Sequence, residues 1–438
     1  MGKNNILKKF IKYVSLNVIG MIGLSFYILA DTFFVSKALG STGLAALNFS
    51  ISLYSLIHGT GLMIGIGAAT SYIFKRSKNN QKDANETFTI AVKIGILIGI
   101  IFLIIGQVFS REISFILGAD SSTIDYSSTY LKVIFSFAPF FILNNILLAF
   151  VRNDSAPKLA MAGMLIGSFS NIILDYIFMF PLKGGMFGAA LATGLAPVIS
   201  IMVLSIHYFN KSNTFNFVKC KLKLKEIKNI FSLGLSSFIN EVSSGIVLIT
   251  FNLVILKISG NIGVAAYGVV ANLALIVIAI FTGIAQGIQP LTSRAYGKKD
   301  IFELNKILKY SIITSIGLST LVYLNTFIFS ENLINIFNSE NNIKLLNIAI
   351  KGLRIYFIGF FFTGINIVLT AYFSAIEKSK KAFLISICRG FLIIIPMVIF
   401  LSNILGMNGV WLSFVLTDFI VALISVTLLF KNKKFIDK

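Results

Sequence analysis

The sequence predicts an all-α integral membrane protein with twelve transmembrane helices, and three observations support this prediction. Of 438 residues, 56% are hydrophobic and only 13% are charged, and the mean hydropathy is +0.88, a composition typical of membrane proteins. The apolar residues form stretches of about 20 residues or more, each long enough to cross a ~30 Å hydrocarbon core as a helix. These stretches are continuously apolar rather than alternating, which favours helices over the strands of a membrane barrel.

Twelve such stretches follow one another along the chain, and each is predicted to be one membrane span. They are residues 14–36, 44–74, 88–109, 130–151, 159–180, 186–209, 231–257, 265–294, 307–330, 352–376, 382–402 and 406–430. The longer stretches must tilt or extend beyond the bilayer.

The basic residues predict the orientation of these spans. The formal net charge is +21, with 38 Lys and Arg residues. If the N-terminus is cytoplasmic, 28 of the 38 fall in inner segments, eight fall in outer segments, and Lys93 and Arg389 lie near inner span ends. This excess follows the positive-inside rule, with both termini cytoplasmic and the chain in the plasma (inner) membrane. The charge therefore indicates topology and contact with anionic lipid headgroups, and it does not indicate nucleic-acid binding.

The chain is predicted to contain two related halves. Residues 40–46 (GSTGLAA) match residues 260–266 (GNIGVAA), at an offset of 220, and residues 185–191 (GMFGAAL) match residues 406–412 (GMNGVWL), at an offset of 221. Six helices per half give both halves the same orientation, so a pseudo-two-fold axis along the membrane normal is expected to relate two lobes. The predicted parts are an N-terminal lobe (1–209), a basic cytoplasmic linker (210–230) and a C-terminal lobe (231–438).

Polar residues within the spans are the candidate functional site, because an ionised carboxylate in a bilayer is costly. Asp31 in the first span, Asn171 and Asp175 in the fifth and Thr193 in the sixth lie at depths of roughly 9, 18, 12 and 15 Å from the outer surface. They are predicted to meet in one outward-facing pocket. Two carboxylates, an amide oxygen and a hydroxyl are suited to Na⁺ as a metal ligand set, or to proton binding by a carboxylate pair.

The internal repeat gives this cluster a further significance. Applying the offsets to the four polar positions gives apolar residues in the second half, namely Phe251, Leu392, Pro396 and Phe414. A cluster needed only for folding could occur in both halves, whereas this one belongs to the first half alone. Hydrogen bonds that join helices are the alternative explanation of the cluster.

The sequence also resembles the multidrug and toxic compound extrusion (MATE) family over nearly its whole length. The resemblance is carried by residues 30–35 (ADTFFV), 265–268 (AAYG), 283–290 (GIAQGIQP), Tyr296-Gly297, Arg389 and Ile395-Pro396. It implies cation-coupled efflux of amphipathic, often cationic drugs between two six-helix lobes. In many members an Asp of helix 1 and an Asn, Asp and Thr of helices 5 and 6 bind the coupling cation, and Asp31, Asn171, Asp175 and Thr193 match that pattern.

This sequence matches two other features of the family only in part. Glu241 matches a glutamate often found in span seven, while the aspartate expected in span ten is missing and Asn366 is the nearest polar residue. Some members bend helix 1 at a proline, which is absent here, and Gly20 and Gly23 could take its place.

Other polar residues of the spans are assigned lesser roles. Glu241, Asn144 and Asn145 are candidate substrate-binding residues, and Asp418 has no partner that the sequence identifies. His58 is expected to be a packing residue. His207 and Arg389, near inner helix ends, are expected to extend toward the membrane surface.

These observations predict an antiporter that exports lipophilic, mainly cationic compounds in exchange for Na⁺ or H⁺, acting as a monomer without a cofactor. Either ion is compatible with an acidic, oxygen-rich pocket. The main alternative is a lipid-linked glycan or polysaccharide flippase, although such proteins commonly have fourteen spans and a basic cleft. An integral membrane enzyme acting on lipids is the other alternative, but no Gly-x-Ser-x-Gly, His-Glu-x-x-His or phosphate-binding glycine motif occurs.

Overall fold

The computed structural model describes residues 3–337 and 342–436, and in this part of the chain the regular structure is entirely helical. The elements are α1 (Lys3–Ser77), α2 (Gln81–Ile116), α3 (Ile124–Ser136), α4 (Ala138–Asn153), α5 (Pro157–Met179), α6 (Gly185–Phe209), α7 (Leu224–Gly297), α8 (Ile301–Ile328), α9 (Ser330–Asn335), α10 (Ile343–Tyr356), η1 (Phe357–Gly359), α11 (Phe360–Ala375), α12 (Ser379–Ile387), η2 (Cys388–Leu392), α13 (Ile394–Leu405) and α14 (Met407–Ile436).

These elements make twelve membrane spans, because two of the helices each contain two. The 75 residues of α1 and the 74 residues of α7 would each extend roughly 110 Å if straight. Each is interrupted once by non-helical backbone angles, α1 at Gly40 and α7 at Gly260. The chain is therefore a multi-pass membrane protein, as predicted.

Three of the predicted spans are not simple helices. The span predicted over 130–151 consists of α3 and α4, which meet at an angle of 50°. The bend lies directly before Pro139, which lacks a backbone N–H and restricts the residue that precedes it. A 3₁₀ turn, η1, joins α10 to α11, and η2 is a π-helical turn between α12 and α13.

The backbone repeats the internal duplication seen in the sequence. Gly40 (φ 64°, ψ −156°) and Gly260 (φ 60°, ψ −159°) have nearly the same conformation at an offset of 220. The positive-φ pairs Gly185/Gly406, Asn79/Lys299 and Ser155/Glu377 follow at offsets of 221, 220 and 222. The same turns thus connect equivalent helices in both halves.

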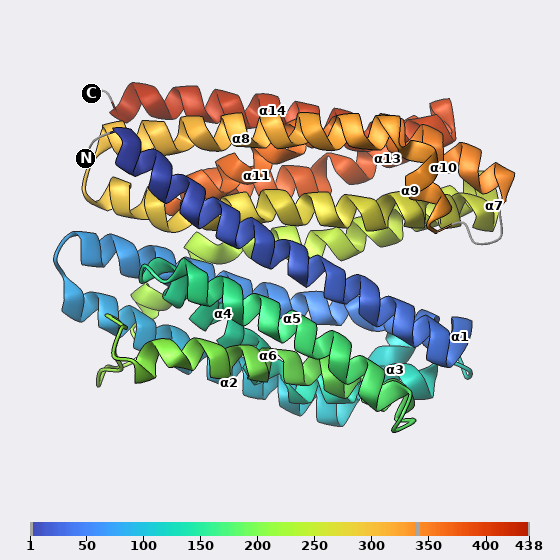
Figure 1. Cartoon of the computed structure of the whole chain (residues 1–438), viewed down its shortest axis with the longest axis horizontal. Coiled ribbons are helices and arrows are strands. Elements are labelled where there is room, and N and C mark those ends of the chain that lie inside the picture. The colour runs from blue at the N-terminus through green and yellow to red at the C-terminus, as the bar shows by residue number, and fades with distance from the viewer. Residues whose placement is uncertain (1–2, 338–341, 437–438) are drawn as a thin grey trace.

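Figure 1 shows the two halves as two bundles lying side by side, with both chain termini at the same end. That end also carries the lysine-rich connections, residues 75–82, 152–158, 210–228, 294–309 and 378–381, and is called the basic end below. The opposite end is called the far end.

The two lobes exchange the first part of their first helix. At the basic end of α1, Ile6, Phe10 and Val14 belong to the hydrophobic core of the second lobe, where the ring of Phe10 lies 5.7 Å from that of Tyr310. Reciprocally, Ile230 near the start of α7 belongs to the core of the first lobe. The lobes are joined at the basic end by this exchange.

Glycines allow the backbones of α1 and α7 to come into contact with each other. A Cβ on Gly234 of α7 would lie 1.8 Å from the carbonyl oxygen of Met63 in α1, and one on Gly67 would lie 2.0 Å from that of Ile230. On the other side, a Cβ on Gly287 would lie 2.8 Å from Cα of Val14. Larger residues would separate the lobes here.

Helix α1 needs no proline, because its backbone angles are helical through Gly20 and Gly23. Both glycines serve packing against α5. A Cβ on Gly23 would lie 2.4 Å from Leu165, and one on Gly20 would lie 3.0 Å from the sulfur of Met164.

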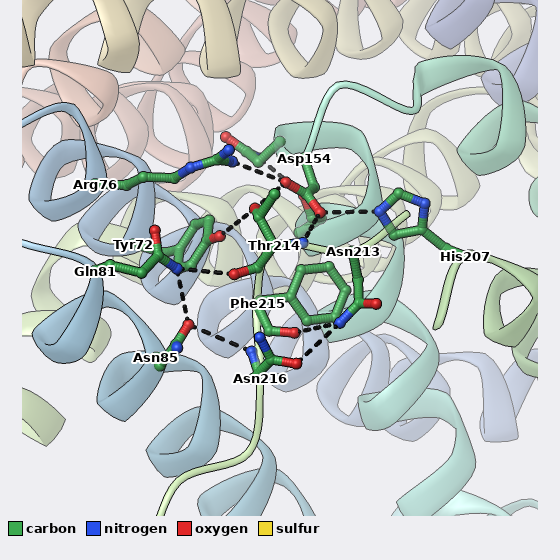
Figure 2. Close-up of polar contacts among 12 residues, drawn as sticks. Tyr72, Arg76, Gln81, Asn85, Asp154, His207, Asn213, Thr214, Phe215 and Asn216 are labelled. Atoms are coloured by element: carbon green, nitrogen blue, oxygen red, sulfur yellow. Dashed lines mark hydrogen bonds and ion pairs between the residues drawn. The ribbon is translucent and has the colours of Figure 1, made fainter. Parts of the chain in front are cut away.

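A cluster of polar and charged residues around the buried Asp154 holds the linker between the lobes against the first lobe (Figure 2). Both carboxylate oxygens of Asp154 are engaged, by Arg76 Nη1 at 2.8 Å and by His207 Nε2 at 2.9 Å. The backbone N–H of Thr214 donates to Asp154 at 2.6 Å, and its hydroxyl also donates to this carboxylate. The extended segment 211–223 therefore lies against α1, α2 and α6 until α7 begins at Leu224.

This cluster corrects the expectation for His207, whose side chain is 5% exposed. It binds a carboxylate inside the protein rather than extending toward the membrane surface. The aspartate lies in the turn between α4 and α5, and no sequence pattern links it to residue 207.

We predict that Gly40→Ala and Gly260→Ala each destabilise the protein by about 1–3 kcal/mol, because their backbone conformation is almost restricted to glycine. Nothing lies within 4 Å of either added Cβ, so backbone strain is the only cause. Thermal unfolding in detergent measures the effect. Gly245→Ala, which adds a methyl group into open space on a helix, is the matched control, and equal melting temperatures for all three would contradict this explanation.

We predict that Asp154→Asn destabilises the protein by about 2–3 kcal/mol, because the buried carboxylate loses the charge that pairs with Arg76 and an acceptor for Thr214. The same thermal measurement applies. Asp125→Asn, which removes an exposed partner of Arg111, should have little effect. An equally small effect of Asp154→Asn would show that the cluster does not hold the linker.

Candidate functional site

The four polar residues predicted for the coupling site lie on three neighbouring helices of the first lobe. Asp31 is on α1, Asn171 and Asp175 are on α5, and Thr193 is on α6. All four are buried, with Asn171 and Asp175 at 0% exposure. The structure thus places them together in the interior rather than on the lipid-facing surface.

Asn171 connects the residues of α5 and α6. With its amide nitrogen directed toward the carboxylate, Asn171 donates to Asp175 Oδ2 at 3.1 Å and accepts from the backbone N–H of Thr193 at 3.2 Å. In the other amide orientation its nitrogen donates to the Thr193 hydroxyl at 3.4 Å. The spacing of four residues places Asn171 and Asp175 on one helical face, as the sequence indicated.

The two carboxylates are close enough to interact electrostatically. Oδ1 of Asp31 and Oδ1 of Asp175 are both buried without a hydrogen-bond donor. No group of three or more His, Cys, Asp or Glu residues suited to a metal occurs in the described part of the chain. The arrangement therefore offers two acids with free oxygens, supplemented by an amide and a hydroxyl, which suits a monovalent cation or a proton better than a transition metal.

Tyrosines surround these acids, and the sequence analysis did not identify them. Tyr130 of α3 is buried beside Thr193 and lies within electrostatic reach of both carboxylates. Tyr27 and Tyr54 share a hydrogen bond of 2.9 Å across the two spans of α1. Tyr27 precedes Asp31 by four residues, so helical spacing could have indicated it, whereas nothing in the sequence points to Tyr130.

A small cavity of about 50 Å³ adjoins the cluster inside the first lobe. Its lining includes both candidate asparagines, Asn144 and Asn145, together with Tyr27, Tyr54, His58 and Thr193. Asn145 donates to the carbonyl oxygen of Phe141, while Oδ1 of Asn144 has no donor. The cavity has several polar side chains in a partly apolar wall, and it is large enough for a few water molecules or an ion.

Glu241 of the second lobe meets the first lobe at the edge of this cavity. Its Oε1 lies 3.1 Å from Nδ1 of His58, and the two side chains are 30% and 15% exposed. The ring of His58 stacks on Tyr54 at 5.7 Å. The contacts from Tyr27 through Tyr54 to His58 thus connect the surroundings of Asp31 with the acid of the opposite lobe.

The second lobe has an aromatic cluster where the first has polar residues. Phe251, the counterpart of Asp31, stacks on Tyr267 at 5.3 Å, and Phe414, the counterpart of Thr193, stacks on Tyr356 at 3.9 Å. Trp411 packs against both tyrosines. The asymmetry predicted from the repeat is therefore also an asymmetry of packing.

The second lobe also buries an acid, Asp418, deep within a span, but this acid has partners. Asp418 of α14 accepts from Arg389 Nε at 2.9 Å, from the Thr363 hydroxyl at 2.8 Å and from Asn366 Nδ2 at 2.9 Å. The expectation that Arg389 extends toward the membrane surface is wrong, because the π-helical turn η2 directs it to Asp418. Asn366, the nearest match to the missing aspartate of span ten, belongs to this network.

Comparison with known proteins places the chain in a family. A sequence profile of the MatE family matches residues 18–177 and 237–400, one segment in each lobe. The multidrug export protein MepA of Staphylococcus saprophyticus is 26% identical over 100% of this chain and 96% of its own length. MepA of Staphylococcus aureus is 26% identical over 98% of this chain and 94% of its own length.

Solved structures agree with this fold. The outward-facing conformation of a multidrug resistance MATE family transporter of the MOP superfamily superposes with a TM-score of 0.92, covering 98% of this chain and 96% of that one at 22% identity. The two-lobed arrangement of twelve spans is shared between them. The chain therefore belongs to the MatE family, the multidrug and toxic compound extrusion transporters.

Proposed function

We propose that this protein is an antiporter that exports lipophilic, mainly cationic compounds in exchange for inward-moving Na⁺ or H⁺. The observation that carries the proposal is the pair of buried acids, Asp31 and Asp175, whose free oxygens lie within electrostatic reach of each other. Holding both ionised without a counter-charge in a low-dielectric interior is unfavourable. Binding one cation or one proton removes most of this repulsion.

The comparison between the two buried acid sites supports a transport role for the first. Asp418 has a guanidinium and two neutral donors, so its charge is compensated permanently. Asp31 and Asp175 form no ion pair among the described residues, and each keeps one buried oxygen without a donor. A site that must load and release an ion should be left uncompensated in this way.

The contacts between the lobes support alternating access. Hydrogen bonds from Arg152 to Gln286, from Asn153 to Gln289 and from Gln289 to Thr70 join the lobes toward the basic end. If the basic end is cytoplasmic, with both termini inside, these contacts close the cytoplasmic side of the interface between the lobes.

Coupling requires the ion to favour one lobe arrangement over another. In the proposed cycle, a cation binds Asp31 and Asp175 from the outside and weakens substrate binding, and the return to the inward-open state releases the cation into the cytoplasm. A series of contacts connects the two lobes, from Tyr27 through Tyr54 to His58 and Glu241. Through these contacts, cation binding in the first lobe would affect Glu241 in the second. The complete path lies within one chain, so a monomer is sufficient.

Glu241 is the residue we assign to cationic substrates, assisted by Asn144 and Asn145. It is partly exposed between the lobes, and its only charged neighbour within 4.0 Å among the described residues is a histidine. A cationic substrate that approaches Glu241 would replace this weak partner. The surrounding aromatic residues suit flat hydrophobic cations.

We predict that Asp31→Asn and Asp175→Asn each reduce gradient-driven export to the background level, because a neutral amide cannot alternate between charged and compensated states. The assay uses purified protein in liposomes with an imposed Na⁺ or H⁺ gradient and a fluorescent cation. Asp125→Asn is the control for an exposed acid. Repeating the assay at fixed pH without sodium distinguishes the two ions.

Export by both variants at the wild-type rate would refute the coupling role. Lipid scrambling without movement of the dye would instead favour a flippase.

We predict that Glu241→Gln weakens the apparent affinity for a cationic substrate about tenfold or more, as expected for loss of a contact to a charged group. The affinity for a neutral lipophilic substrate should change little. The measurement is the substrate concentration that half-saturates export, with Glu112→Gln, an exposed acid of α2, as the control. Equal losses for charged and neutral substrates would assign Glu241 a structural role.

A further inference from the structure

A second cavity, of about 320 Å³, lies between the lobes at the basic end, separate from the acidic cluster. Its lining includes Tyr13, Arg76, Ser77 and Ser155 from the first lobe, and Arg294 and Lys298 from the second. Its volume falls at the small end of the ~300–1,000 Å³ range of ligand pockets. It meets the surface at Ser155 and Lys298, which are both exposed.

The cavity contains three cationic side chains and no acidic one. Arg76 projects from the first lobe, and Arg294 and Lys298 project from the second. The nearby Arg152 is buried and donates to the neutral acceptors Asn17 and Gln286. Like charges are thus brought together at the place where the lobes touch, and this opposes their association unless an anion lies between them.

Among the described residues, one acid is bonded to this group, and an excess of positive charge remains. Asp154 binds Arg76 through Nη1, while both of its oxygens also accept from His207 and Thr214. The other guanidinium donors of Arg76 remain available, since an arginine has five N–H groups. Arg294 and Lys298 form no ion pair in the described part of the chain.

We propose that this cavity is a binding site for a phosphate group, held by Arg76 on one lobe and by Arg294 and Lys298 on the other. Guanidinium groups bind phosphate oxygens in pairs of parallel hydrogen bonds, and lysine adds a point charge. The hydroxyl groups of Ser77 and Tyr13 are further donors at the wall. The phosphate is the headgroup of an anionic inner-leaflet phospholipid, or it is a free phosphate anion from the cytoplasm.

The position of the site gives it a consequence for transport. Its cations come from both lobes, so all three can contact one phosphate only while the basic ends are together. A ligand that binds one arrangement preferentially stabilises that arrangement. The phosphate therefore favours the state in which the basic end is closed, independently of any cation at Asp31 and Asp175.

The test is a thermal-shift titration of the full chain in neutral detergent supplemented with phosphatidylcholine. One arm adds phosphatidylglycerol and a second adds inorganic phosphate. The expected result is a rise in melting temperature that saturates. In Arg294→Gln/Lys298→Gln, the half-saturating concentration should increase about tenfold or more, as expected for loss of charge-assisted hydrogen bonds.

Lys219→Gln/Lys221→Gln is the matched control, because it removes the same charge from two exposed lysines of the linker. Its half-saturating concentration should remain unchanged. Ser155→Asp is an independent variant, which adds a carboxylate at the mouth of the cavity without removing a cation. It should also weaken the response, and aspartate tolerates the positive φ of residue 155.

The two titrations distinguish the two possible sources of the phosphate group. Saturation by phosphatidylglycerol alone identifies a lipid headgroup, and saturation by inorganic phosphate identifies a soluble anion. The proposal is overturned if neither raises the melting temperature, or if the control loses the response as fully as the cavity variants. The experiment involves no ion gradient, so its outcome does not depend on the coupling mechanism.

Discussion

The contact on which the rest of this structure depends is the backbone-to-backbone approach of α1 and α7 at the basic end. Gly67 and Gly234 bring the second span against the seventh, and Gly287 brings the eighth against the first. Small residues are the usual means by which helices associate in lipid, where apolar side chains gain little by leaving the hydrocarbon. The exchanged ends of the two long helices then enter the core of the opposite lobe.

This junction determines where the lobes can move and where they cannot. Because the linker is held to the first lobe through Asp154, it does not act as a free tether between two independent bodies. The lobe motion proposed above must instead open the glycine contacts and the hydrogen bonds of Gln286 and Gln289. Such polar contacts can be exchanged for water when the interface opens, so the junction can be strong without being permanent.

The two lobes share the same backbone turns but differ in the side chains at equivalent positions. Aromatic stacking fills the second lobe at the positions of Phe251 and Phe414, and its single deeply buried acid near these helices, Asp418, is compensated by Arg389. The first lobe leaves Asp31 and Asp175 with unused oxygens near a small, partly polar cavity. The two halves therefore share their turns, whereas these equivalent positions are polar in the first half and apolar in the second.

Charges of opposite sign gather at two places in the molecule, within the spans of the first lobe and at the basic end between the lobes. Within the spans of the first lobe, Asp31 and Asp175 interact as like charges, and at the basic end Arg76, Arg294 and Lys298 line one cavity between the lobes. In the two proposals made above, each arrangement is relieved by a small ion of opposite sign, so the energy of the protein would depend on what is bound.

The sequence by itself determined the membrane class, the number of spans and the duplication, because these follow from the length and periodicity of apolar segments and from repeated glycines. It also indicated Asp31, Asn171, Asp175 and Thr193, since polar residues are rare in a span and so are conspicuous there. Their proximity to Tyr130, the pairing of Arg389 with Asp418 and the contact of His207 with Asp154 were decided only by the tertiary structure. These contacts join helices far apart in the chain, and the bend before Pro139 and the π-helical turn η2 rotate side chains away from the faces that regular helical spacing assigns to them.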